Sequence, residues 1–347
     1  KYAKNPVLDE KNVPEGSSLE DFRDPKMFKH EDHFYAVIGS RTIDDKGQVL
    51  LYRSENLLEW EFVSVVLQHN PYLGTMVECP DFMEVDGKAV FMLSAMNYTD
   101  KETNTFYPHI TWFVEGEMDW DTHNFTMHGI KELDKGMDFY APQSFSKEGE
   151  TTVIAWMQGW NNTIASDTLK HGWAGQMTLP RKLFYEDSIL KQVVVPAFEQ
   201  ALNTIREETE ITAEGELLLT EKAPKYLTMR IPVDNLSETL KLRLGKERGE
   251  HIFLNIDGEN KQLSLDRGQT AYPIKDRDGK VFDKTRRLSF ADKEELFIQI
   301  YNDRSSVEVI VNNEESLTMT YYASEPLQAW SIISGAPSVL RDVKIAD

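Results

Sequence analysis

Cysteine is nearly absent from this sequence, and long apolar runs are absent altogether. Cys79 is the one cysteine in 347 residues, so the chain cannot form an internal disulfide and nothing ties it to an oxidising compartment. No apolar stretch approaches the roughly 20 residues that a membrane-spanning helix needs. We therefore expect a cytoplasmic protein with no membrane partner.

Positive charge is also scarce. The chain has 38 Lys and Arg residues against 58 Asp and Glu residues, which gives a net charge of −20. Because this charge repels polyanions, we expect no nucleic-acid partner. The sequence has no glycine-rich phosphate loop, no Gly-x-Ser-x-Gly turn, and no histidine at ligand spacing from cysteine or acidic residues. We accordingly predict no metal, nucleotide or other cofactor.

One pattern occurs three times: an acidic residue lies just ahead of a proline that we expect to open a strand. The copies are Phe22-Arg23-Asp24-Pro25, Val77-Glu78-Cys79-Pro80 and Asp138-Phe139-Tyr140-Ala141-Pro142. The prolines are 55 and then 62 residues apart, and a tight polar turn and a second strand follow each copy. Short strands at such a period are typical of a β-propeller, where proline suits the start of a strand because it cannot donate to the ladder. Repeated carboxylates would converge on the central channel, where a small polar ligand could bind.

β-strand patterns dominate the chain, and their character changes near residue 205. Beyond that point apolar residues alternate strictly, which indicates antiparallel strands buried on one face, as in a sandwich. The alternating positions include Leu227, Met229, Ile231, Ile252, Leu254, Ile256, Leu296, Ile298 and Ile300. Residues 196–210 have roughly helical spacing and predict a helical connector. We therefore predict an all-β chain, with a propeller domain over residues 1–205 and a β-sandwich over residues 206–347.

Two carboxylates stand out from the many acidic residues, most of which we expect to be solvated surface. Asp24 and Glu78 lie at similar places in the repeat, among apolar residues, where burying an unpaired carboxylate is costly. Arg23 could pair with Asp24 in a structural ion pair. Glu78 has no cation beside it in the sequence, and burial there would favour the neutral form that a general acid needs.

Aromatic residues near these positions suggest a sugar pocket. Tyr140, Trp156, Trp160 and Trp173 lie in or near strand starts and loops. Most such residues in a β-protein simply pack in the core. Together with the carboxylates, however, they fit a site in which acids bind hydroxyl groups and rings stack on a sugar.

These motifs resemble the successive signatures of glycoside hydrolase family 32, the invertases and β-fructofuranosidases. The resemblance runs along the whole chain and includes Gly172-Trp173-Ala174-Gly175, Thr178-Leu179-Pro180-Arg181 and Asp303–Val309. It implies a five-bladed propeller joined to a β-sandwich. It also implies hydrolysis, with retention, of terminal β-D-fructofuranosyl bonds in a small sugar such as sucrose, sucrose phosphate or a fructo-oligosaccharide.

The resemblance also implies roles for individual residues. Glu78 matches the general acid/base, and Asp24 matches the carboxylate that holds fructose hydroxyls and stabilises the transition state, with Arg23 beside it. Asp138, Tyr140 and Trp156 match substrate-binding positions less closely.

One family signature has no match here. The Trp-Met-Asn-Asp-Pro-Asn stretch of the first blade, which supplies the nucleophilic Asp, is absent. The resemblance therefore predicts a partial propeller that lacks the first blade and part of the second, with an open edge that could allow self-association. Because a retaining glycosidase needs two carboxyls about 5–5.5 Å apart, we expect this chain to be inactive alone.

Three functions from different classes remain open at this stage. The first is a β-fructofuranosidase whose missing part is supplied elsewhere or lost. The second is a non-catalytic carbohydrate-binding protein or a vestigial glycosidase fragment. The third is an inverting glycosidase of a related propeller family that acts on arabinosides or xylosides, and the sandwich with Asp303–Val309 argues against it.

Overall fold

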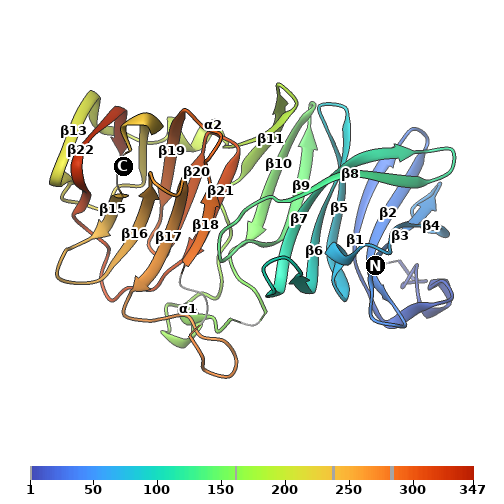
Figure 1. Cartoon of the computed structure of the whole chain (residues 1–347). Helices are drawn as coiled ribbons and strands as arrows, with labels where there is room; N and C mark the ends of the chain where they lie inside the picture. The colour runs from blue at the N-terminus through green and yellow to red at the C-terminus, as the bar shows by residue number, and fades with distance from the viewer. Residues whose placement is uncertain (1, 161, 237–238, 282–284) are drawn as a thin grey trace. The chain divides into compact units, whose positions relative to one another are not determined.

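The computed structural model describes residues 2–160, 162–236, 239–281 and 285–347, and Figure 1 shows the chain. Within these ranges the chain is almost entirely β-structure, so the predicted all-β class is confirmed. The strands are β1 (Ser17–His30), β2 (His33–Thr42), β3 (Gly47–Ser54), β4 (Glu61–Leu67), β5 (Met76–Val85), β6 (Lys88–Asp100), β7 (Thr105–Asp119), β8 (Asn124–Glu132), β9 (Tyr140–Lys147), β10 (Glu150–Trp156), β11 (Arg181–Glu186), β12 (Ile189–Val194), β13 (Thr204–Thr220), β14 (Tyr226–Pro232), β15 (Thr239–Gly245), β16 (His251–Asp257), β17 (Gln262–Gln269), β18 (Thr285–Ser289), β19 (Glu295–Asn302), β20 (Ser306–Val311), β21 (Glu315–Thr320) and β22 (Trp330–Ala346). The helices are η1 (Glu10–Asn12), η2 (Pro71–Leu73), α1 (Ala165–Thr168), α2 (Pro196–Gln200) and η3 (Val233–Asn235).

The chain forms two compact units that interleave along the sequence. The first unit contains Lys1–Leu133 and Tyr140–Ala155, and the second contains Asp134–Phe139 and Trp156–Asp347. The predicted domain boundary near residue 205 rests on the change of strand pattern and stays a prediction. Among the described residues, no helix is long and apolar enough to span a membrane.

The first unit is built from small antiparallel sheets of the kind found in propeller blades. Strands β1 to β4 form one sheet in sequence order, β5 to β8 form the next, and β9 with most of β10 follows. The predicted turn at Asp86-Gly87 has positive φ at both residues (48° and 78°), as a tight two-residue hairpin requires. Apolar side chains of both complete sheets, among them Val37, Leu51 and Phe91, share one buried core. This core holds β1 and β5 side by side.

The other face of the β1 to β4 sheet is only partly covered. Its buried residues include Ile38 and Tyr52, and the Tyr52 hydroxyl donates to the Asn12 carbonyl at 2.7 Å. Beside them lies an apolar hollow of about 820 Å³. Met27 and Leu58, which line this hollow, keep 57% and 43% of their surface exposed.

The second unit contains a β11–β12 hairpin and the predicted β-sandwich. Strand β22 pairs with β15 through its first half and with β14 through its second half, so it joins the two sets of strands that enclose the core. The alternating apolar positions predicted from the sequence are all buried in this core: Leu227, Met229, Ile231, Ile252, Leu254, Ile256, Leu296, Ile298 and Ile300. The predicted sandwich is confirmed.

The predicted helical connector over residues 196–210 is wrong in length. The helix α2 ends at Gln200, and the 17-residue strand β13 begins at Thr204. Ile205, which the helical spacing included, is 54% exposed in that strand. Pairing of β13 with β22, which starts at Thr204, outweighs the weak helical pattern.

A buried ion network anchors the second unit. Arg181 is 2% exposed, and its guanidinium donates to Asp134 Oδ2 at 2.9 Å and to Glu308 Oε2 at 2.5 Å. Thr318 Oγ1 receives a further hydrogen bond from Arg181 at 2.6 Å. Two of the sequence motifs, one ending in Arg181 and the other containing Glu308, therefore meet in a structural cluster of the kind that costs stability when one partner is removed.

Candidate active site

Strands β1, β5 and β9 each contain a proline that follows a residue with positive φ. Asp24 has φ 59°, Cys79 has φ 45° and Ala141 has φ 49°. In β1 and β5 the pairing register shifts at this point, which marks a β-bulge. The prediction that these prolines open their strands is therefore wrong for β1 and β5. A bulge tolerates proline inside a strand because one residue is already left out of the ladder.

The three positions that lie two residues before the prolines meet in space. Arg23 donates to Glu78 Oε1 from Nη2 at 2.9 Å and from Nε at 3.3 Å. The Tyr140 hydroxyl donates to Glu78 Oε2 at 2.6 Å. Both oxygens of the Glu78 carboxylate therefore accept hydrogen bonds, as a buried carboxylate requires, since Glu78 is only 8% exposed. Glu78 has no cation beside it in the sequence, and the expectation of a site without a cation is wrong. The fold supplies Arg23 from the preceding copy of the repeat.

Tyr140 is the most buried member of this cluster. It is 2% exposed, and the ring of His109 lies edge-on against it with the centroids 4.9 Å apart. Burial, followed by the charge of Glu78, raises the pKa of the Tyr140 phenol above its ordinary value. The phenol therefore remains protonated and acts as a hydrogen-bond donor to the carboxylate.

Arg23 is held in turn by Asp21, and not by Asp24 as the sequence suggested. The Arg23 guanidinium pairs with Asp21, whose other oxygen pairs with Arg41. Burial raises the pKa of Asp21, but hydrogen bonds from Arg41 and Arg23 outweigh it, and the pKa is lowered overall. Asp21 thus remains charged and keeps Arg23 turned toward Glu78.

Asp24 accepts hydrogen bonds from the equivalent position of the next copy. Asp24 Oδ2 lies 3.1 Å from the backbone nitrogen of Cys79 and 3.6 Å from its Sγ. Burial and the charge of Asp24 raise the pKa of the Cys79 thiol to about 12. The thiol is therefore an inert donor that helps to orient the Asp24 carboxylate.

A third set of contacts lies one and two residues beyond the prolines, and sequence reasoning missed it. Lys26 Nζ donates to Asp81 Oδ2 at 3.1 Å, and the Ser144 backbone N–H donates to the same oxygen. Asp81 is fully buried, and burial raises its pKa although Lys26 acts in the opposite direction. The signal that could have found this pair is the offset of 55 residues, which relates Arg23 to Glu78, Asp24 to Cys79 and Lys26 to Asp81.

A glycine allows the two sheets to approach each other at this site. Gly39 pairs with Arg23 across β1 and β2. A Cβ atom on Gly39 would lie 2.3 Å from the Val77 carbonyl oxygen and 3.3 Å from Pro80 Cδ. Only glycine therefore permits β5 to lie close enough for Glu78 to reach Arg23.

The two remaining predicted site residues, Asp138 and Trp156, belong to the second unit. Asp138 is 1% exposed and pairs with Arg267, and its Oδ2 accepts hydrogen bonds from the Thr320 backbone N–H at 2.8 Å and hydroxyl at 2.9 Å. Trp156 is partly exposed, and its ring lies edge-on to that of Trp160 at 5.2 Å. Their predicted substrate contacts stay predictions.

The chemistry available in the first unit is that of carboxylates, an arginine and a phenol. Among the described residues, no group of three or more His, Cys, Asp or Glu side chains is placed to hold a metal ion. A buried carboxyl such as Glu78, held on both oxygens by proton donors, can exchange a proton with a bound hydroxyl or leaving oxygen.

Comparisons with known proteins agree on one family. The model described as "Glycosyl hydrolases family 32 N-terminal domain" matches residues 1–195, and "Glycosyl hydrolases family 32 C terminal" matches residues 197–346. The chain is 33% identical over 329 residues to a sucrose-6-phosphate hydrolase of Zymomonas mobilis, covering 89% of this chain and 60% of that protein. It is 34% identical over 310 residues to a raffinose invertase of Escherichia coli, covering 87% and 61% respectively.

Solved structures show the same relationship. A GH32 β-fructofuranosidase of Bombyx mori is 28% identical to the chain with a TM-score of 0.77, and the match covers all of this chain and 68% of that structure. A mutant of the same enzyme in complex with sucrose matches with a TM-score of 0.76. The chain spans about 60% of the length of the curated relatives named here.

Proposed function

Because the chain belongs to glycoside hydrolase family 32, we propose that it takes part in the hydrolysis of terminal β-D-fructofuranosyl bonds in sucrose or sucrose phosphate, with retention of configuration. The names of its relatives, a sucrose-6-phosphate hydrolase and a raffinose invertase, support this substrate class. The observation that carries the proposal is the Glu78 carboxylate, held between Arg23 and Tyr140 where the repeats meet.

In this proposal Glu78 is the general acid/base. A general acid must give a proton to the leaving oxygen and then take one from water in the second step. Arg23 and Tyr140 fix the carboxyl in one orientation from two sides, which favours such proton transfer. Asp24 is the proposed carboxylate that binds fructose hydroxyls and stabilises the transition state. Arg23 and Tyr140, and in the second unit Asp138 and Trp156, are the proposed substrate contacts.

We further propose that the 347-residue chain by itself hydrolyses sucrose negligibly. No residue of the sequence matches the family's nucleophilic Asp, and one carboxyl cannot complete a retaining mechanism. The direct test is fructose release from sucrose and from sucrose phosphate by the purified chain. Turnover at a rate typical of an enzyme would show that another carboxylate acts as the nucleophile, and the assignment of roles would be wrong.

The role of Glu78 is tested in a longer, active form that carries the missing signature. Glu78→Gln should lower kcat about 10²–10⁴-fold on sucrose and much less on a fructoside whose leaving group needs no protonation. The matched control is Glu84→Gln, because Glu84 lies on the same strand but is exposed. Equal losses on the two substrates would assign Glu78 a structural role.

The alternative proposal is a non-catalytic carbohydrate-binding protein or a vestigial glycosidase fragment. The absent nucleophile favours it for this chain taken alone. It predicts that sucrose binds and is recovered unchanged. Because both proposals expect this chain alone to leave sucrose unchanged, they are separated in a longer form that carries the missing signature: fructose release from sucrose there supports the first proposal, and sucrose binding without turnover supports the alternative.

Self-association is a further part of the proposal. The apolar hollow beside Met27 and Leu58 leaves large hydrophobic side chains in water, and such surfaces tend to bind a partner. The proposed partner is a second copy of this chain. A cytoplasmic location also stays a proposal, which rests on the lone cysteine.

A further inference from the structure

A second polar cluster ties together the three strands of the candidate active site. It consists of Lys26 on β1, Asp81 on β5 and Ser144 on β9, which we call the support cluster. Lys26 Nζ donates to Asp81 Oδ2 at 3.1 Å and to the Ser144 carbonyl oxygen. The Ser144 backbone N–H donates to the same Asp81 oxygen. Each of the three residues therefore contacts both of the others, and all of them belong to the first unit.

The backbone does not set the distance between β1 and β5 at this place. The two strands belong to different sheets, so no ladder of backbone hydrogen bonds joins them. In β1 the pairing register with β2 shifts between Arg23 and Lys26. In β5 the register with β6 shifts between Glu78 and Asp81. Because a bulge locally disrupts the ladder, the position of β1 against β5 depends here on side-chain contacts.

The Lys26–Asp81 pair is drier than the Arg23–Glu78 pair. The side chains of Lys26 and Asp81 are 22% and 0% exposed, against 34% and 10% for Arg23 and Glu78. Asp81 Oδ1 is buried without a hydrogen-bond partner among the described residues, and burial raises the pKa of Asp81 although Lys26 acts in the opposite direction. Apolar side chains of similar size often serve stability as well as a buried ion pair does. The pair is therefore better explained by the geometry that it imposes than by the stability that it gives.

Only a short stretch of backbone separates this pair from the candidate catalytic carboxyl. Asp81 lies three residues after Glu78 on β5, and Lys26 lies three residues after Arg23 on β1. If β1 and β5 moved apart, the distance from Arg23 Nη2 to Glu78 Oε1, now 2.9 Å, would grow with them. Glu78 would then lose a donor that fixes one of its oxygens. A misplacement of about 1 Å at a reacting group can lower a rate about 10²-fold.

We propose that Lys26 and Asp81 are positioning residues, which hold β1 against β5 so that Glu78 stays oriented between Arg23 and Tyr140. In this role they act through Glu78 and do not contact the sugar. The catalytic consequence rests on the proposed function of Glu78, whereas the spacing of the strands does not.

Cys79 reports on this spacing in the 347-residue chain itself. It is the one cysteine of the sequence, and its Sγ on β5 lies 3.6 Å from Asp24 Oδ2 on β1. Burial and the charge of Asp24 raise the pKa of its thiol to about 12. Lys26→Met removes the cation that joins the strands, so the pKa of the thiol should fall toward its ordinary value. Alkylation by iodoacetamide at pH 8 should become about tenfold faster for each unit of that fall.

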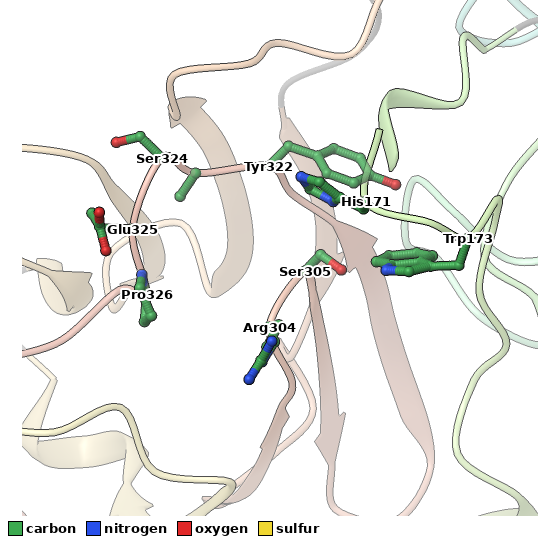
Figure 2. Close-up of a pocket in the computed structure, with 9 residues that line it drawn as sticks. His171, Trp173, Arg304, Ser305, Tyr322, Ser324, Glu325 and Pro326 are labelled. Atoms are coloured by element: carbon green, nitrogen blue, oxygen red, sulfur yellow. The ribbon is translucent and has the colours of Figure 1, made fainter. Parts of the chain in front are cut away.

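Two variants control for the loss of a positive charge. Lys29→Met removes an exposed lysine from the same strand, β1. Arg304→Met removes a charge from the second unit, where Arg304 lines a separate cavity with Trp173 and Tyr322 (Figure 2). Both variants should react with iodoacetamide at the rate of the unmodified chain, and unchanged thermal unfolding midpoints show that they are folded.

A double variant separates positioning from stability in the longer, active form. Lys26→Met combined with Asp81→Leu leaves no buried charge unpaired, so it should restore the thermal midpoint that Lys26→Met alone lowers. Its kcat on sucrose should still be lower about tenfold or more. The loss should be smaller on a fructoside whose leaving group needs no protonation, because a misoriented acid matters only where a proton must be given. If Lys26→Met alone does not fold, this comparison of substrates decides.

Several outcomes would overturn the proposal. Alkylation of Lys26→Met at the rate of Lys29→Met would show that the pair does not hold the strands. Recovery of both kcat and stability in the double variant would leave the pair a purely structural role. Equal losses on the two substrates would mean that the pair acts on something other than Glu78. If Glu78→Gln itself shows no dependence on the leaving group, the proposed function of Glu78 fails, and the alkylation rates still decide whether the pair positions the strands.

Discussion

Replacing Gly39 by alanine should separate two of the sheets that form the candidate active site, those of β1 and β5. The new Cβ atom would lie 2.3 Å from the Val77 carbonyl oxygen of β5. A carbon and an oxygen come no closer than about 3.3 Å in ordinary contact, so β5 must move by about 1 Å. The hydrogen bond from Arg23 Nη2 to Glu78 Oε1, now 2.9 Å, would then lengthen to nearly 4 Å and be lost.

The expected cost follows from these two effects. Overpacking of a buried contact costs about 1–3 kcal/mol, and loss of a charged hydrogen bond adds about 1.5–3 kcal/mol. The movement of β5 that breaks the hydrogen bond also relieves part of the overpacking, so the two costs do not add in full. We therefore expect the free energy of unfolding to fall by about 2–4 kcal/mol. Urea denaturation measures this loss. Hydrogen exchange followed by mass spectrometry should show faster exchange in β5 peptides.

Gly129→Ala is the matched control for this experiment. Gly129 also lies in a strand of the first unit, β8, and a Cβ atom there would meet only the Glu115 carboxylate, at 3.8 Å. It should change stability by less than about 0.5 kcal/mol. If Gly39→Ala were as stable as Gly129→Ala, with β5 exchange unchanged, the close approach of the sheets at Gly39 would not be what joins Arg23 to Glu78.

Four further predictions concern other parts of the molecule. Tyr140→Phe removes the donor to Glu78 Oε2 and should cost about 1.5–3 kcal/mol in urea denaturation, whereas no loss would show that the bond is replaced. The pKa of Cys79 is raised from 9.0 to about 12, so its thiolate fraction at pH 8 falls about 1000-fold. Alkylation of the native chain by iodoacetamide should therefore be correspondingly slow at pH 8, and its rate should rise with pH up to about 12. A pH profile of the alkylation rate with its midpoint near 9 would refute this. Arg181→Met leaves two buried carboxylates unpaired and should cost about 3–5 kcal/mol by denaturation, with near-neutral stability as the contrary result. Leu58→Glu should shift the chain toward monomer in sedimentation velocity, and a wild-type chain that is monomeric at high concentration would exclude self-association through this face.

The sequence predicted the main architecture because its signals are periodic and local. Alternation at Leu227, Met229 and Ile231 reports directly on which face is buried, and the tight turn at Asp86-Gly87 reports on backbone conformation. Strand burial and turn conformation depend on residues that are close together in the sequence, so they can be predicted without knowledge of the tertiary structure.

The pairing of the site could not be read in the same way. Arg23 and Asp24 are adjacent in sequence, yet the bulge in β1 directs Arg23 to Glu78 and leaves Asp24 with the backbone of Cys79. Sequence reasoning paired chemical neighbours along the chain, whereas the fold pairs equivalent positions of successive repeats. The surroundings of Asp138 depend on Arg267, a partner more than a hundred residues away, for which the sequence offers no local signal.

The segment Asp134–Phe139 makes the two compact units inseparable by a single cut. It lies in the sequence between β8 and β9 of the first unit, but its Asp134 and Asp138 carboxylates are bound by Thr318 and Thr320 of the second. A fragment that stopped near residue 205 would keep both acids and lose both threonines, which leaves charges without their buried donors. The complementary fragment would keep the threonines without the acids. Split halves of this protein would therefore have to fold together, each serving as the template for the other.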